Sequence, residues 1–233
     1  MADEKTMQQN IPLKLIHMDE IEATDTRWLW YPYIPYGKIT IIQGDPGEGK
    51  TTLVLHLAAE LTQGKMFGFE EQQEPVTVIY QTAEDGLADT IKPRLIAANA
   101  DCSKVLVIDE TEQCVSMTDG RLEAAIQQTD ARLVILDPIQ AYLGADVDMH
   151  RANQIRPIMS HLGSIAEKYG CAIVLIGHMN KASGQKAYQI CFSVSSSASN
   201  AVISSQNSSN DFTASSSGLL SESVWSLSSF RSR

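Results

Sequence analysis

Apolar residues follow two patterns along the first 190 positions of the chain. Short runs rich in Val, Ile and Leu are apolar at consecutive positions, as is typical of strands buried on both faces of a parallel sheet. These runs predict strands at residues 38–43, 75–81, 104–108, 132–136 and 171–176. Apolar residues at helical spacing predict helices at residues 51–62, 87–98, 119–128 and 151–169. Strands that alternate with helices predict an α/β fold, a mostly parallel sheet with helices on both faces.

Three residues refine the predicted helices. Asp119 has the side chain of a helix cap and is expected to begin the third helix. Pro93 is expected to kink or break the second helix, because proline lacks the N–H that a helix interior requires. Pro157 lies within the first third of the fourth helix.

Composition divides the chain into three parts. Residues 1–24 form a polar N-terminal segment, and residues 25–190 carry the patterned, globular sequence. Residues 191–233 contain 18 serines in 43 positions and only four charged residues. Such a segment buries too little apolar surface to offset its ordering entropy, so we expect a disordered, serine-rich tail.

Charge and targeting signals limit the possible partners. Lys and Arg number 18 against 28 Asp and Glu, a net charge of −10, which excludes a uniformly basic protein that coats nucleic acid. Binding through a few basic loops remains possible. The N-terminus is polar and no apolar run approaches the ~20 residues that cross a bilayer, so we expect a cytoplasmic protein without a membrane partner. The four cysteines include no C-x-x-C pair and are expected to be free thiols.

Residues 44–51 read GDPGEGKT and fit the phosphate-binding pattern G-x-x-x-x-G-K-[ST] between a predicted strand and a predicted helix. The loop and the first helical turn contain the residues Gly44, Asp45, Pro46, Gly47, Glu48, Gly49, Lys50, Thr51 and Thr52. The glycines allow a tight turn that points N–H groups at phosphate oxygens. Lys50 offers a positive charge to the β- and γ-phosphates, and the Thr51 hydroxyl is a ligand for Mg²⁺. The pattern predicts a site for ATP and Mg²⁺.

Acidic residues follow two of the predicted strands. Asp137 comes directly after the apolar run 132–136 and is predicted to hold the Mg²⁺ shell. Many enzymes with such a phosphate loop place the general base next to this aspartate. Here the next residue is Pro138, which cannot act as a base, so the base must come from elsewhere. Glu84 follows the run 75–81 and is predicted to orient or deprotonate the attacking water, because ligands bind at the carboxyl edge of open α/β sheets. Asp85 is the rival base, and a helix-capping role for Glu84 is the structural alternative.

His178 follows the last predicted strand and is predicted to face the γ-phosphate, where an imidazole can donate a hydrogen bond. A purely structural histidine is the open alternative.

The order and spacing of GDPGEGKT, QTAED, KVLVIDE, RLVILDPIQAYLGAD and LIGHMNKASGQKA resemble the RecA-like ATPases. The resemblance covers about residues 25–188 and is closer to the hexameric replicative helicases of the DnaB and plasmid RepA type. It implies that Lys50 and Thr51 bind ATP–Mg²⁺, that Glu84 is the catalytic glutamate, and that Asp137 is the metal-shell aspartate. It implies further that His178 senses the γ-phosphate.

The same resemblance implies a ring of identical subunits with single-stranded DNA passing through it. Two segments are candidates for DNA-contacting loops: residues 144–156, with Arg151 and Arg156, and residues 180–186, with Lys181 and Lys186. A few cations per subunit suffice when they are multiplied around a ring. Ordinary solvated loops are the alternative. Trp28, Trp30, Tyr31, Tyr33 and Tyr36 are expected to pack on the sheet rather than stack on bases.

The RepA-like pattern ends near Tyr188, where the serine-rich segment begins, and we interpret this change as a frameshift or truncation. RepA-type domains continue there with more strands and an arginine that reaches the neighbouring subunit's ATP. Arg231 and Arg233 match no such motif. An ATP-dependent regulatory or assembly module of the KaiC-like kind, without helicase activity, is the alternative function. DNA-stimulated ATP turnover separates the two.

Overall fold

The computed structural model describes residues 13–67, 72–144, 147–148 and 151–178, with the backbone alone for residue 178 and for residues 201–205, 211–216 and 225–226. Its main sheet contains, in spatial order, β10 (Trp225–Ser226), β9 (Asp211–Ser216), β8 (Ala201–Ser205), β3 (Ile39–Gly44), β7 (Ala172–His178), β6 (Leu133–Asp137), β4 (Val78–Thr82) and β5 (Val105–Leu106). All neighbours from β8 to β5 are parallel, whereas β9 and β10 are antiparallel additions at one edge. The predicted α/β fold is confirmed.

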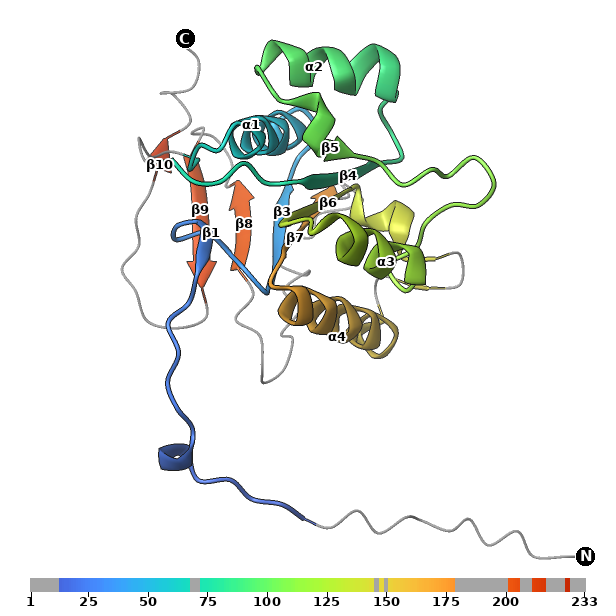
Figure 1. Cartoon of the computed structure of the whole chain (residues 1–233). Helices are drawn as coiled ribbons and strands as arrows, with labels where there is room; N and C mark the ends of the chain where they lie inside the picture. The colour runs from blue at the N-terminus through green and yellow to red at the C-terminus, as the bar shows by residue number, and fades with distance from the viewer. Residues whose placement is uncertain are drawn as a thin grey trace, which may run out of the picture.

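Four α-helices cover this sheet in the described part of the chain: α1 (Lys50–Thr62), α2 (Lys92–Ala97), α3 (Gly120–Thr129) and α4 (Ala152–Tyr169). Figure 1 shows α1 and α2 on one side of the sheet and α3 and α4 on the other. The shorter elements are η1 (Met18–Glu20), η2 (Leu87–Ile91), η3 (Cys102–Lys104), η4 (Ile139–Tyr142), and a two-stranded hairpin of β1 (Trp28–Trp30) and β2 (Ile34–Pro35).

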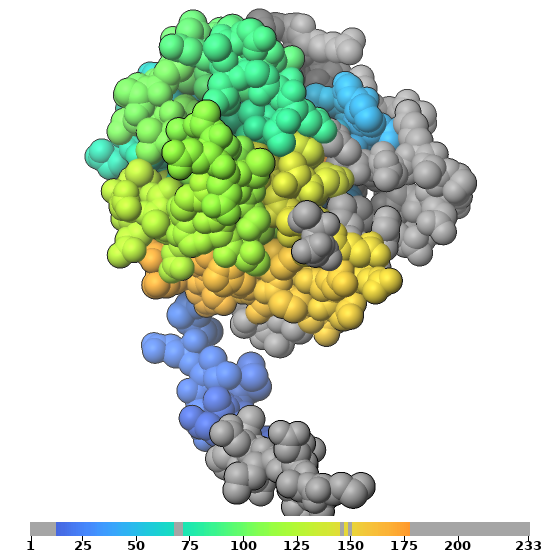
Figure 2. Space-filling model, turned by 90° about the vertical axis from the view of Figure 1, so that its right-hand side faces the viewer, coloured from blue at the N-terminus to red at the C-terminus, as the bar shows by residue number. Residues whose placement is uncertain are grey.

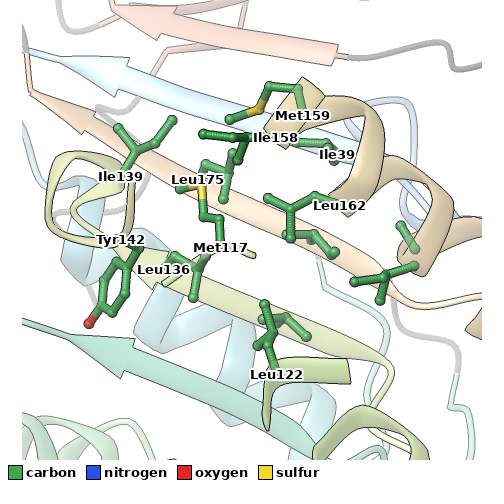
Figure 3. Packing of buried hydrophobic residues seen from close by; sticks show 14 of the residues in the cluster. Ile39, Met117, Leu122, Leu136, Ile139, Tyr142, Ile158, Met159, Leu162 and Leu175 are labelled. Atoms are coloured by element: carbon green, nitrogen blue, oxygen red, sulfur yellow. The ribbon is translucent and has the colours of Figure 1, made fainter. Parts of the chain in front are cut away.

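The sheet separates two apolar cores, because successive side chains of a strand point to opposite faces. In β6, Leu133 and Ile135 pack toward α1, whereas Val134 and Leu136 pack toward α3 and α4. Figure 3 shows the core between the sheet and helices α3 and α4, where Leu162 of α4 lies over the sheet. Burying one such side chain contributes about 1.5–3 kcal/mol. Burial on both faces explains why the strands read as uninterrupted apolar runs.

Most predicted elements are confirmed with small shifts at their ends. Asp119 caps α3, since its Oδ1 accepts a hydrogen bond of 2.9 Å from the Arg121 backbone N–H. Pro157 lies inside α4 as expected. The predicted helix 87–98 is instead the π-helical turn η2 followed by α2. Pro93 falls in the first turn of α2, directly after η2, so the regular α-helix is interrupted close to the proline, as predicted.

The predicted strand 104–108 is shorter in the structure, where only Val105 and Leu106 pair with β4. The Gln81 side chain replaces further pairing at Ile108. Its Oε1 accepts the Ile108 N–H at 2.6 Å, and its Nε2 donates to the Ile108 carbonyl at 3.3 Å. A side-chain amide therefore takes the place of a strand backbone and lets the chain leave the sheet.

The aromatic stretch before β3 packs as expected. Trp30 contacts the rings of Tyr33 and Phe67, each with centroids 4.8 Å apart, and Leu29 is buried beside them. Trp28 and Tyr31 form an edge-on pair at 5.3 Å. The hairpin of β1 and β2 that carries these residues was not predicted from the sequence.

The two ends of the described chain differ from the core. Residues 13–27 extend away from the body as an arm (Figures 1 and 2), with Leu13, Leu15 and Met18 all more than three-quarters exposed. Strands β8, β9 and β10 lie within residues 191–233, for which disorder stays a prediction. The remainder of residues 191–233 lies outside the described residues. None of the described helices is long and apolar enough to cross a membrane.

Candidate nucleotide-binding site

The parallel sheet brings the predicted site residues to one edge. Gly44, the first residue of the phosphate loop, is paired with His178 at the ends of β3 and β7. Thr82 is paired with Asp137 at the ends of β4 and β6, and Glu84 follows two residues later. Because these strands run in the same direction, the loop and both acids leave the sheet at its carboxyl edge, where ligands bind in folds of this class.

The phosphate loop is shaped by left-handed glycines. Gly47 and Gly49 have φ values of 85° and 86°, a region that side-chain-bearing residues rarely adopt. The Asp45 N–H donates to Glu48 Oε2 at 2.7 Å and tightens the turn. The α1 helix begins immediately afterwards at Lys50, so the positive end of its dipole and its first N–H groups face the loop. This arrangement suits a bound phosphate.

Lys50 is buried, with 4% of its surface exposed. Its Nζ donates to the Gly44 carbonyl at 3.0 Å and to the Asp45 carbonyl at 2.8 Å. Burial lowers the pKa of Lys50, and the charges of Glu48, Asp137, Asp45 and Glu84 oppose that shift. An incoming phosphate would supply the negative charge that favours the lysine cation.

Asp137 is also buried, with 4% exposed. Its Oδ2 accepts a hydrogen bond of 2.8 Å from the Thr51 hydroxyl and another of 3.2 Å from the Tyr80 hydroxyl. The structure thus joins Thr51 and Asp137, the two residues predicted to meet Mg²⁺. Burial raises the pKa of Tyr80 far above its usual range, so this phenol remains a hydrogen-bond donor.

The donor set fits Mg²⁺ in the presence of a nucleotide. A hydroxyl and a single carboxylate are hard oxygen ligands, and Mg²⁺ in such sites takes its other ligands from phosphates and water. No group of three or more His, Cys, Asp or Glu residues able to hold a metal by itself occurs among the described residues.

Glu84 and Asp85 have different surroundings. Asp85 faces α2, where its carboxylate lies 3.8 Å from Arg94 Nη1, and its N–H donates to the Thr82 hydroxyl at 3.3 Å. Glu84 is exposed, and its charge favours the cationic form of Lys50. The helical turn η2 begins after Gly86, and the alternative of Glu84 as a capping acid stays open.

The remaining predicted residues are placed only in part. The His178 backbone lies beside the start of the phosphate loop, while Lys181 and Lys186 lie outside the described residues. Arg151 is the N-cap residue of α4, and its Nε pairs with Asp148 at 3.2 Å. Arg156 is exposed in the following turns of α4.

Sequence reasoning missed Tyr80. One signal was available: an amphipathic tyrosine in the run 75–81, which was predicted to be buried strand, one residue before its end. The partner of its hydroxyl, however, depends on how β4 and β6 are aligned, and a single sequence does not supply that alignment.

The AAA domain family matches residues 8–184 of the chain. The chain belongs to this family. This AAA domain is similar to the DNA repair protein RadA of Halalkalibacterium halodurans, with 29% identity over 147 residues, covering 62% of the chain and 28% of the relative. RadA of Streptococcus pneumoniae is 27% identical over 186 residues, covering 76% and 40%. RadA of Escherichia coli is 26% identical over 165 residues, covering 68% and 32%.

The chain therefore spans less than half the length of these relatives. Together with the parallel sheet and the phosphate loop, the matches identify the AAA domain as a RecA-like P-loop ATPase domain. The finer resemblance to RepA- and DnaB-type helicases stays a prediction.

Proposed function

We propose that this AAA domain binds ATP with Mg²⁺ and hydrolyses it, and that turnover is coupled to single-stranded DNA as in a RepA-type helicase or a related replication or recombination ATPase. The observation that carries the proposal is the 2.8 Å hydrogen bond between Thr51 and Asp137 beside the phosphate loop. This bond joins the loop to a carboxylate from another strand, as a shared magnesium site requires.

Each residue has a distinct part in hydrolysis. Lys50 exchanges its carbonyl partners for phosphate oxygens and stabilises the charge that develops on them. Thr51 and Asp137 would hold Mg²⁺, which would neutralise charge on the phosphates. Glu84 accepts a proton from the attacking water. His178 donates a hydrogen bond to the γ-phosphate from the end of β7.

The nucleotide part of the proposal is tested by binding. Replacing Lys50 with Ala removes a charged hydrogen-bond donor and should weaken binding of a fluorescent ATP analogue on the order of 10- to 100-fold. Lys92→Ala is the matched control, because Lys92 is an exposed lysine on α2. Equal affinity of Lys50→Ala and wild type would refute the assigned site.

The DNA part rests on different support. The relatives are named DNA repair proteins, and Arg151, Arg156, Lys181 and Lys186 are the cations that a ring of subunits would present to a DNA backbone. The test compares ATP turnover with and without single-stranded DNA. Stimulation by DNA supports a motor.

A second candidate function is an ATP-dependent regulatory or assembly module of the KaiC-like kind. Exposed apolar side chains on the arm of residues 13–27 suit a module that changes its assembly state. ATP-dependent change in molecular mass, with turnover indifferent to DNA, would favour the KaiC-like regulatory module over the helicase.

A further inference from the structure

The Tyr80 side chain, which belongs to none of the sequence motifs, is hydrogen-bonded to the candidate metal carboxylate of Asp137. It belongs to β4 and is fully buried, with 0% of its surface exposed. Its hydroxyl lies 3.2 Å from Asp137 Oδ2. The same oxygen accepts the Thr51 hydroxyl at 2.8 Å, so two donors from different elements converge on one carboxylate oxygen.

The strand register explains how the phenol reaches this position. Tyr80 is paired with Ile135 on β6, two residues before Asp137, and both share the core on the α1 side. A tyrosine ring is long enough to extend one such step along the sheet toward its carboxyl edge. Tyr80 also lines a cavity of about 240 Å³ with Leu95 and Val105, and its ring belongs to the core on the α1 side while its hydroxyl meets the site.

We propose that Tyr80 is a positioning residue for the metal site: its hydroxyl fixes the orientation of the Asp137 carboxylate that the Thr51 hydroxyl shares. The inference rests on the proposed ATP–Mg²⁺ function. The Thr51 hydroxyl holds the carboxylate from the first turn of α1, at the end of the phosphate loop. Tyr80 holds it from the sheet, and partners of this kind orient metal ligands and tune metal affinity.

A buried phenol also needs a hydrogen-bond partner for purely structural reasons, and the test must separate the two roles. Tyr80→Phe keeps the ring, its packing and the cavity wall, and removes only the hydroxyl. Tyr142→Phe is the matched control. Tyr142 is equally buried, lies in the core of the opposite face (Figure 3), and its hydroxyl has no hydrogen-bond partner among the described residues.

The readout is nucleotide binding rather than turnover. A fluorescent non-hydrolysable ATP analogue is titrated in EDTA and then at increasing MgCl₂. Tyr80→Phe should raise the MgCl₂ concentration that gives half of the magnesium-dependent gain on the order of 10-fold, with affinity in EDTA unchanged. Tyr142→Phe should behave as wild type in both titrations. A half-saturation point for Tyr80→Phe within twofold of wild type would overturn the positioning role.

Two further results complete the test. Wild-type protein that binds no nucleotide, or binds it without any magnesium dependence, overturns the proposed function and this inference together.

Asp137→Asn provides a second measurement that does not depend on the stability of one variant. In its background, Tyr80→Phe should cause no additional shift in the MgCl₂ requirement, and an undiminished 10-fold shift there would show that Tyr80 acts through something other than Asp137.

Discussion

Two neighbouring acids follow β4, and their surroundings give them different capacities. The Asp85 carboxylate faces Arg94 at 3.8 Å, and its backbone is fixed to Thr82. Glu84 is exposed, and its charge acts electrostatically on Lys50. A base must reach water at the phosphate, so Glu84, the more exposed of the two acids, is the better candidate.

Glu84→Gln should therefore lower ATP turnover on the order of 10²-fold while leaving nucleotide binding nearly intact, because an amide cannot accept the proton of water. Asp85→Asn is the matched control and should retain most turnover. Steady-state phosphate release and binding of a fluorescent ATP analogue measure the two effects. Normal turnover in Glu84→Gln together with its loss in Asp85→Asn would assign the base to Asp85.

Cys171 makes the stability of the folded protein depend on pH. Its side chain is fully buried, and burial raises the pKa of the thiol from 9.0 to about 11. Below pH 9 the thiol is protonated in both folded and unfolded chains, and its contribution to stability is fully present. Between the two pKa values only the unfolded chain loses the proton, so the contribution is lost as the pH rises toward 11.

Urea unfolding between pH 8 and pH 10.5 measures this effect. The free energy of unfolding should fall with pH more steeply in wild type than in Cys171→Ala, by up to about 1.4 kcal/mol per pH unit. Cys114→Ala, at an exposed cysteine, should keep the wild-type slope. Identical slopes for all three proteins would contradict a raised thiol pKa.

At the scale of elements, the sequence predicted what depends on local pattern and missed what depends on neighbours. The apolar runs of β3, β6 and β7 and the loop before α1 were found because their periodicity and glycine spacing are local properties. The shortened β5 was not, because Gln81 competes for the backbone of Ile108 from another strand. The interruption of the helix at 87–98 was predicted from Pro93, but its form, the π-helical turn η2, was not.

The candidate site divides in the same way. The phosphate loop follows from eight consecutive residues, and Asp137 from its place after an apolar run. The contact of Tyr80 with Asp137 needed the β4–β6 register, and the contact of Asp85 with Arg94 needed the position of α2. Neither is encoded in a pattern that a single sequence displays.

Pro157 allows a test of how one residue inside α4 affects the stability of the fold. It is exposed inside α4 and cannot donate the hydrogen bond that the helix offers at this position. Pro157→Ala restores that donor and helix propensity, while the unfolded chain gains some freedom. The free energy of unfolding should rise by about 1–2 kcal/mol in urea titrations. A lower value than wild type would show that the proline at this position is needed for packing of α4 on the sheet.

At the scale of the whole molecule, a net charge of −10 works against a nucleic-acid partner unless cations are concentrated locally. Arg156 is exposed on α4, in the segment that follows the carboxyl end of β6. A ring would repeat this cation in every subunit, so a modest effect in one chain would be multiplied.

Arg156→Ala should weaken binding of single-stranded DNA and lower the slope of log affinity against log salt by about 1 for each bound subunit. Fluorescence anisotropy at several salt concentrations measures both. Lys104→Ala, beside β5, is the control and should leave the slope unchanged. An unchanged slope in Arg156→Ala would remove α4 from the DNA interface.

The burial of the sheet on both faces also has a consequence for hydrogen exchange. The amides of β3, β6 and β7 are bonded to a strand on each side and covered by apolar layers above and below. They should exchange with solvent deuterium only when the whole domain unfolds, whereas the arm of residues 13–27 should exchange within seconds. The phosphate loop follows β3 directly, so its amides should exchange at rates between those of the central strands and those of the arm. If added nucleotide slows exchange in the phosphate loop and leaves the rates of the central strands unchanged, the nucleotide orders the loop locally. A rise in global stability would slow the central strands as well.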